Sequence, residues 1–288
     1  MHLLEPIDDD IRIAHEMLIS GNAYEADRRV SSFLADLASS SFASDATRLA
    51  AHFLLVRIAL RRLDVSTARH YLTRAREQLS DNVNSAQRLF QIGRAHWLAG
   101  EIAHTEYVMG NGRANIAKLQ YEQARDSYQF EMIPVSRFEI ERKLACVAAH
   151  SNKEHARSRL QNLRLKTQAP LHLPTYHRIA LSLAKLAVLS NSASAEDIDR
   201  CWEAARFYSN SAVRDRYWYV ESLITACCVS VSCGAPDPLR CRRRSALLPA
   251  AVELSPRLRW RQVRAQQLAS GKASVAMGSV LYVSVRYW

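Results

Sequence analysis

The segment Tyr121-Glu122-Gln123-Ala124-Arg125-Asp126-Ser127-Tyr128 carries the clearest sign of how this chain is built. It contains no glycine or proline, and it places a small residue, Ala124, one helical turn before a bulky one, Tyr128. A small side chain lets two helices approach closely, and the bulky side chain fills the space against a neighbouring pair of helices. The segment therefore predicts one helix of a close-packed pair.

The same spacing of a small and a bulky side chain occurs in three other parts of the chain. The matching pairs are Ala26 and Val30, Ala68 and Leu72, and Ala156 and Leu160. Successive alanines of the four pairs lie 42, 56 and 32 residues apart, so the pattern recurs without a constant period. We interpret it as a series of helix pairs of unequal length.

Helix-forming composition extends over most of the chain. No proline occurs between Pro6 and Pro134 or between Pro174 and Pro236, and apolar side chains recur at helical spacing. Strand-like runs are absent before the last ten residues, so the sequence predicts an all-α protein. We expect five helix pairs, at residues 8–19 with 23–37, 45–63 with 66–79, 85 onward with 115–130, 134–150 with 154–165, and 174–189 with 195–208. One further helix is expected at residues 213–231.

This pattern resembles the tetratricopeptide repeat family of helix–turn–helix pairs. Residues 121–128 are similar to the start of that family's second helix, and residues 98–103 (Leu-Ala-Gly-Glu-Ile-Ala) to its first helix, with a small residue at the close crossing. Looser matches occur at residues 21–26 and 64–68, and residues 110–112 add length to the third pair. The alternative is an α-helical bundle without repeats.

The resemblance implies an α-solenoid, a superhelix whose first helices line a concave groove. Such grooves bind extended peptides or partner proteins. Irregular arrays of this kind resemble the sensor halves of bacterial transcription regulators. For a member of that group we expect a truncated or stand-alone sensor, because the first helix pair begins near residue 8. The expected organisation is a helical-repeat domain over residues 1–235 and a basic, poorly structured tail over residues 236–288.

Candidate groove residues cluster on the first helix of the third pair. Trp97 would act as an aromatic anchor, with Glu101 and His104 sharing its face, and Arg94 would hold a carboxylate or phosphate. Arg57 occupies a comparable position in the second pair. The alternative is a packed tryptophan beside solvated charges.

The sequence contains no motif that points to catalysis, a cofactor or a metal. Phosphate-cradling glycine loops, the nucleophile motif GxSxG and the zinc motif HExxH are all absent. His150 and His155, like His172 and His177, lie close together without an evident third ligand. We therefore expect a non-catalytic protein without cofactor or metal.

The net charge of +11 is concentrated near the C-terminus. Residues 240–288 hold ten Lys or Arg and one acid, Glu253, a net charge of +9, whereas the other 239 residues carry +2. Arginines around a tryptophan can bind nucleic acid through phosphate contacts and stacking. The candidate residues are Arg240, Arg242, Arg243, Arg244, Arg257, Arg259, Trp260, Arg261 and Arg264. The tail is interpreted as a flexible basic arm, a docking segment for an acidic partner or an altered reading frame.

The N-terminal residues lack the positive start and apolar core of a secretory signal. The most apolar stretch, residues 49–60, is too short to span a bilayer, which requires about 20 apolar residues. None of the six cysteines forms a CxxC pair. The sequence thus predicts a cytoplasmic protein with reduced thiols. The partner we expect is a protein or peptide, not a membrane.

Overall fold

The computed structural model describes residues 8–39, 45–79, 85–129, 135–168, 172–210 and 215–233. They divide into two compact units, one ending at Glu131 and the other beginning at Met132, and each unit is described by itself. The described residues form eleven α-helices. The tail predicted over residues 236–288, with its nine nucleic-acid candidates, and the domain boundary at 235 lie outside the described residues.

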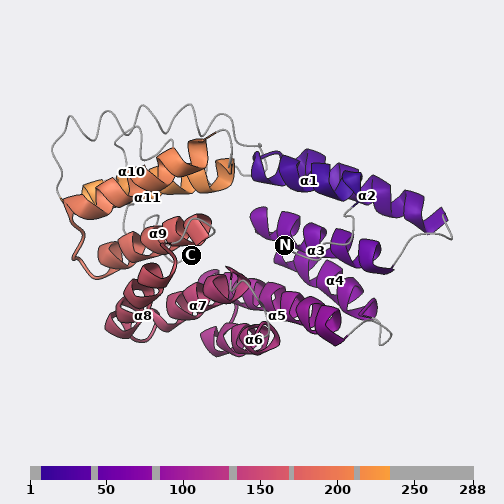
Figure 1. The fold of residues 1–288 in the computed structure, drawn as a ribbon, viewed down its shortest axis with the longest axis horizontal. Coiled ribbons are helices and arrows are strands. Elements are labelled where there is room, and N and C mark those ends of the chain that lie inside the picture. The colour runs from indigo at the N-terminus through magenta and orange to yellow at the C-terminus, as the bar shows by residue number, and fades with distance from the viewer. Residues whose placement is uncertain are drawn as a thin grey trace. The chain divides into compact units, whose positions relative to one another are not determined.

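The first unit consists of three helix pairs (Figure 1). Its helices are α1 (Asp9–Ile19), α2 (Ala23–Ser39), α3 (Asp45–Arg61), α4 (Val65–Glu77), α5 (Ser85–Val108) and α6 (Ala114–Ser127). Each first helix packs on its second helix, and each pair packs on the next one. In addition, α3 contacts both α1 and α5, so the first helices of consecutive pairs lie next to one another.

Local signals in the sequence account for the helix starts. The Asp8 side chain accepts a hydrogen bond from the amide of Asp10 at 2.9 Å, and Asp64 accepts one from Thr67 at 3.1 Å. Both carboxylates satisfy amides that have no partner within the helix, and both lie where negative charge favours the helix dipole. The turn between α1 and α2 needs Gly21, whose φ of 95° is costly for any residue with a Cβ atom.

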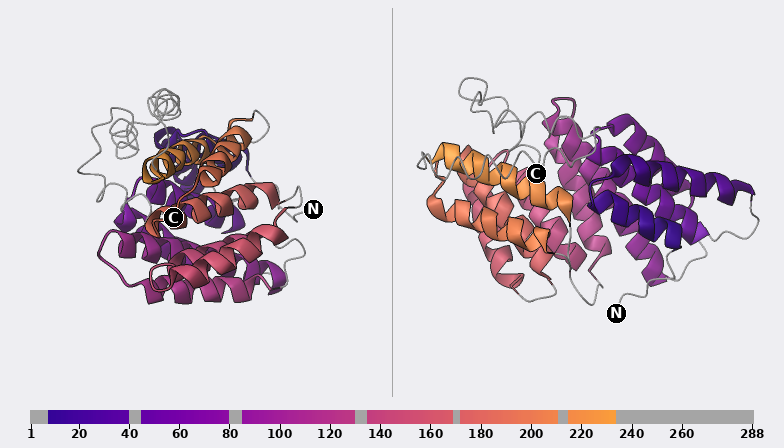
Figure 2. Two further views of the ribbon diagram at one scale, coloured as in Figure 1. Left: turned by 90° about the vertical axis from the view of Figure 1, so that its left-hand side faces the viewer. Right: turned by 90° about the horizontal axis from the view of Figure 1, so that it is seen from above.

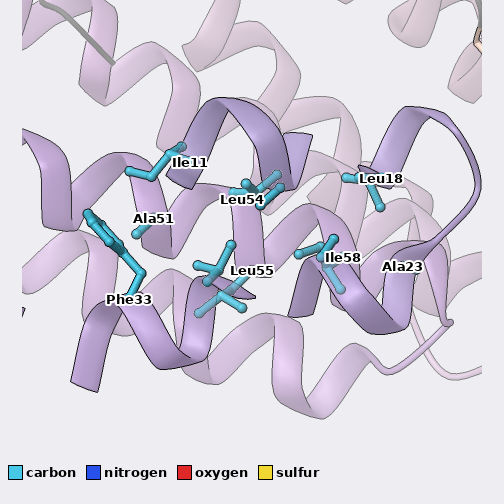
Figure 3. Packing of buried hydrophobic residues seen from close by; sticks show 11 residues of the cluster. Ile11, Leu18, Ala23, Phe33, Ala51, Leu54, Leu55 and Ile58 are labelled. Carbon is cyan, nitrogen blue, oxygen red and sulfur yellow. The ribbon is translucent and has the colours of Figure 1, made fainter. Parts of the chain in front are cut away.

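The core of the first unit follows the small-and-bulky pattern. Ala26, Ala68 and Ala124 have no exposed surface. Ala26 packs with residues of α1 and α3 in a cluster that includes Ile11, Phe33, Leu54, Leu55 and Ile58 (Figure 3). Ala68 belongs to a second cluster, which joins α3, α4 and α5. The burial expected from the spacing of these alanines is therefore confirmed.

Helices α5 and α6 approach most closely at two glycines. A Cβ atom added to Gly100 would lie 2.6 Å from the Tyr121 ring, and one added to Gly93 would lie 2.9 Å from the Cβ of Ser127. Both glycines lie on the same face of α5, two turns apart, so the bare backbone forms the surface on which α6 packs. Tyr121 and Tyr128 fill this interface and are both buried.

The second unit contains two helix pairs and one further helix. Its helices are α7 (Val135–Ala148), α8 (Lys153–Lys166), α9 (Leu173–Leu189), α10 (Ala195–Ser209) and α11 (Arg216–Ser232). Neighbours in sequence pack together, α9 also contacts α7 and α11, and α10 lies beside α11 (Figure 2). Asn152 caps α8, and Ser194 and Asp197 form a reciprocal capping box at the start of α10.

The expected helices are confirmed, with ends that differ by a few residues from the predicted ones. An all-α fold of sequentially packed helix pairs is thus established for the described residues. None of the helices in these ranges is both long enough and apolar enough to cross a membrane.

Replacement of Gly100 by alanine should destabilise the first unit by about 1–3 kcal/mol, because the Tyr121 ring would have to move. Helix propensity alone would act in the opposite direction, since alanine is favoured over glycine by about 1 kcal/mol. Urea denaturation followed by circular dichroism measures the difference. A variant as stable as the wild type, or more stable, would contradict the close crossing.

Candidate functional site

Helix α5 carries four of the five groove candidates, and Arg57 lies on α3. Arg94 faces α3, where its guanidinium lies 5.1 Å from the centre of the Phe53 ring. Arg57 follows Phe53 by one helical turn on α3 and is partly buried. Arg94 on α5 therefore contacts the Phe53 ring on the neighbouring helix α3.

Arg94 is a cation without an acidic partner among the described residues. No ion pair in the described ranges includes it, and the only nearby titratable group that favours its charge is the Tyr128 hydroxyl. Burial lowers the pKa of Arg94 below its usual value, because removal of water disfavours the charged form. The stacking contact with Phe53 offers a partial replacement for hydration.

Trp97 and His104 follow Arg94 on α5, and their rings meet aromatic rings of Tyr128 and Tyr121. The Trp97 indole donates a hydrogen bond to Glu101 at 3.3 Å, and its ring meets the Tyr128 ring edge-on, with 6.5 Å between the centres. His104 is buried and meets the Tyr121 ring at the same centre distance. The structure thus brings Trp97 and Glu101 together, whereas His104 packs within the interface of α5 and α6.

The second unit contains a buried charged cluster that the sequence did not reveal. Helix α9 has one apolar face toward α7 and α8, with Ile179, Leu183 and Leu186, and another toward α10 and α11, with Leu181 and Ala184. Its third face carries three polar residues, Arg178, Ser182 and Lys185. All three bond to side chains of α7 or α11.

Glu139 of α7 is the centre of this cluster. It accepts hydrogen bonds from Arg142 at 3.0 Å and from Arg178 at 3.1 Å, while Arg142 also donates to the Ser182 hydroxyl at 3.2 Å. The side chains of Glu139 and Arg142 are 4% and 2% exposed. Both guanidinium groups also lie over the Trp218 ring of α11, at 5.8 Å for Arg142 and 4.9 Å for Arg178.

The two arginines keep Glu139 ionised. Burial by itself would raise the pKa of Glu139, but the charges of Arg142 and Arg178, together with hydrogen bonds, lower it to about 2. The effect is reciprocal: burial alone would lower the pKa of Arg178, but Glu139, together with Tyr208 and Asp215, raises it above its usual value. The cluster therefore holds its charges by mutual compensation.

Lys185 and Glu221 extend the cluster to α11 as a second buried ion pair. Their side chains are 5% and 6% exposed, so neither charge is hydrated to an appreciable extent. The three first-position helices α7, α9 and α11 are consequently joined by ionic contacts on one continuous face.

A spacing signal for this cluster was present in the sequence. Polar residues at 178, 182 and 185 form a stripe along a helix that is otherwise apolar at most positions. Such a stripe is also typical of a face in contact with water, and α9 alone does not distinguish the two cases.

Metal ligands and nucleophilic side chains are the other groups that could support chemistry. Within the described ranges, no three His, Cys, Asp or Glu side chains gather closely enough to hold a metal ion. Cys146 is buried beside Ser182, and burial raises the pKa of its thiol. It is therefore a poor nucleophile in this setting.

Comparison with known proteins adds no assignment: no family model matches the chain, and no curated protein is found to be similar to it.

The cluster should make stability depend on acidity through Glu139. Its pKa in the folded state, about 2, lies below the ordinary value of 4.5, so the ionised group stabilises the fold above about pH 4.5. This contribution, on the order of 3 kcal/mol, should disappear as the pH falls toward 2. Urea denaturation measures the free energy of unfolding of the wild type and of Glu139→Gln. The difference between the two proteins should be smaller at pH 3 than at pH 7. Glu16→Gln is the control, because Glu16 pairs with Arg12 at the exposed surface. This variant should unfold with nearly the same free energy as the wild type at either pH.

Loss of one partner from the buried pair of Lys185 and Glu221 should cost about 3–5 kcal/mol, because the remaining charge stays buried and loses its ionic partner. Lys185→Met and Glu221→Leu are each expected to show this loss in denaturation experiments. The double variant should be more stable than either single variant, since it buries no charge. Additive losses in the double variant would contradict this account. The exposed pair of Arg74 and Glu77 provides the control, with single losses of about 1 kcal/mol or less.

Proposed function

We propose that the chain is a non-catalytic helical-repeat scaffold of the tetratricopeptide type that binds a peptide or partner protein. The proposal is supported by the contacts of α3 with α1 and α5, and of α9 with α7 and α11, because first helices that pack side by side are typical of repeat stacks. It is supported also by the alanines of the pattern, which are buried where helices of a pair meet. A cytoplasmic regulatory sensor is the role we favour.

We place the binding surface around Arg94 because of the surroundings of this residue. Arg94 is partly buried and has no acidic partner among the described residues, unlike Arg142 and Arg178, whose charges Glu139 compensates. A desolvated arginine is prepared to accept a carboxylate, since charge-assisted hydrogen bonds form without further loss of water. The ligand we propose for this position is an acidic side chain or a C-terminal carboxylate of a peptide.

The aromatic neighbours of Arg94 suit the same ligand. Phe53 supports the guanidinium from one side, and Trp97 lies one helical turn further along α5. An apolar side chain of the peptide can pack on Trp97 while an adjacent carboxylate meets Arg94. The charged cluster of the second unit, by contrast, has its charges paired internally and acts in this proposal as a rigid support.

Arg94→Ala should weaken the binding of acidic peptides on a peptide array by about 10- to 100-fold, the equivalent of one charge-assisted hydrogen bond. Trp97→Ala should also weaken binding. Arg69→Ala is the matched control, because Arg69 is exposed and pairs with Glu106. If both Arg94→Ala and Trp97→Ala bind peptides as the wild type does, the surface proposed here is not the binding site.

A second candidate function is the binding of DNA or RNA through the arginine-rich tail. The observation that favours it is the net charge of +9 over residues 240–288. Each phosphate contact releases a counterion, so affinity should fall steeply as salt rises.

Fluorescence-anisotropy titrations of a labelled oligonucleotide between 50 and about 200 mM salt should show a decrease of roughly 10³-fold if about six phosphates are contacted. A chain that ends at Gly234 should lose this binding, because it lacks the nine candidate residues. Equal binding by the shortened and the full chain would exclude the tail as the contact surface.

A further inference from the structure

The face of α5 that carries Arg94 and Trp97 also carries Phe90. Steps of four, three and four residues separate Phe90, Arg94, Trp97 and Glu101, so the four side chains form one row along the helix, here called the α5 stripe. Phe90 is 38% exposed, and the other three side chains are partly buried. The α5 stripe thus presents, in order, an apolar ring, a cation, a second ring and an acid.

Tyr128, directly after α6, holds both rings of the α5 stripe in place. Its ring meets the Phe90 ring edge-on with 5.2 Å between the centres, and it meets the Trp97 ring edge-on at 6.5 Å. Tyr128 is only 3% exposed and so belongs to the core. Because the two rings are already supported, little side-chain freedom is lost when a ligand packs on them.

Arg94 sets the charge of the ligand. It has no acidic partner within the described ranges, and its guanidinium lies against the Phe53 ring at 5.1 Å from the centre. An acidic side chain opposite Arg94 would form charge-assisted hydrogen bonds between the two rings of the α5 stripe. Glu101 disfavours a second acid at the other end, beyond Trp97. The matching ligand therefore carries one acid between two large apolar side chains.

The spacing of the α5 stripe distinguishes a helical ligand from an extended one. Phe90 and Trp97 are seven residues apart, which corresponds to about 10.5 Å along the helix axis. Side chains at positions i, i+4 and i+7 of a ligand helix repeat with the same rise, so all three can meet the α5 stripe in register. Three alternate side chains of an extended peptide span about 13 Å. That mismatch would displace one apolar side chain from its ring.

We propose that the partner segment bound along α5 is an amphipathic helix with one acidic residue between two large apolar residues, spaced as Phe90, Arg94 and Trp97 are. This inference rests on the proposed function, because it uses the same surface. It adds the conformation of the ligand, and it adds Phe90 as a residue that determines specificity. An extended peptide with the same side chains is the alternative that the experiment distinguishes.

The test measures binding of two labelled peptides to the full chain by fluorescence anisotropy. Both are short, alanine-rich peptides with Leu, Glu and Leu at positions i, i+4 and i+7. One is held in a helix by a side-chain lactam, and the other carries a central proline that prevents a helix. We expect the helical peptide to bind at least tenfold more tightly than the proline peptide. Replacement of its Glu by Gln should weaken binding at least tenfold.

A variant and a matched control locate the contact on the protein. Phe90→Ala should weaken binding of the helical peptide at least tenfold, because it removes one of the two rings. Leu89→Ala is the control, because Leu89 is 37% exposed but lies on another face of α5, and it should bind as the wild type does. Circular dichroism shows whether Phe90→Ala is folded. If it is not, replacement of each peptide leucine by alanine tests the same contacts with the wild-type chain.

Equal binding of the helical and the proline peptide would overturn the helical ligand, and so would unchanged binding by folded Phe90→Ala. If the proline peptide binds more tightly and loses affinity with Arg94→Ala, the proposed function stands and only the helical ligand is wrong. If neither peptide binds, the helical ligand is also wrong, and the array of acidic peptides decides separately on the proposed function.

Discussion

Close approach of paired helices at small residues is the constraint on which the rest of this structure depends. At Gly100, α6 packs its Tyr121 ring against bare backbone, and Ala26 and Ala156 have no exposed surface. Because the helices of a pair are so close, each pair presents a single thin layer with apolar residues on both sides. Within each unit, each layer is covered by the next, so packing there follows the order of the chain.

In the second unit, α9 has one face that belongs to neither of its two apolar clusters. On α9 that face carries Arg178, Ser182 and Lys185, and their partners come from α7 and α11. Buried ion pairs gain little net stability, because desolvation offsets much of the attraction. Their geometric demands are strict, however, so they favour one alignment of α7, α9 and α11 over others that apolar contacts alone would tolerate.

Four of the buried or partly buried arginines form two groups with different consequences. Arg142 and Arg178 share Glu139 and are locked within the second unit. Arg94 and Arg164 each lie against an aromatic ring and lack an acidic partner in the described residues. A cation in the second group has lost part of its hydration without an acidic partner among the described residues, and charge-assisted hydrogen bonds to an anion are stronger than neutral ones.

The sequence by itself determined the helices, their order in pairs and the burial of Ala26, Ala68, Ala124 and Ala156, because apolar spacing and the absence of proline act over one or two helical turns. Only the tertiary structure decided which polar residues lose contact with water. The polar stripe of α9 could have faced solvent, and it became buried because α7 and α11 supply Glu139 and Glu221. Likewise, sequence spacing grouped His104 with Trp97, but the position of the Tyr121 ring on α6 determined that His104 packs inside the interface. Such outcomes depend on side chains that are distant in sequence, and no local pattern specifies them.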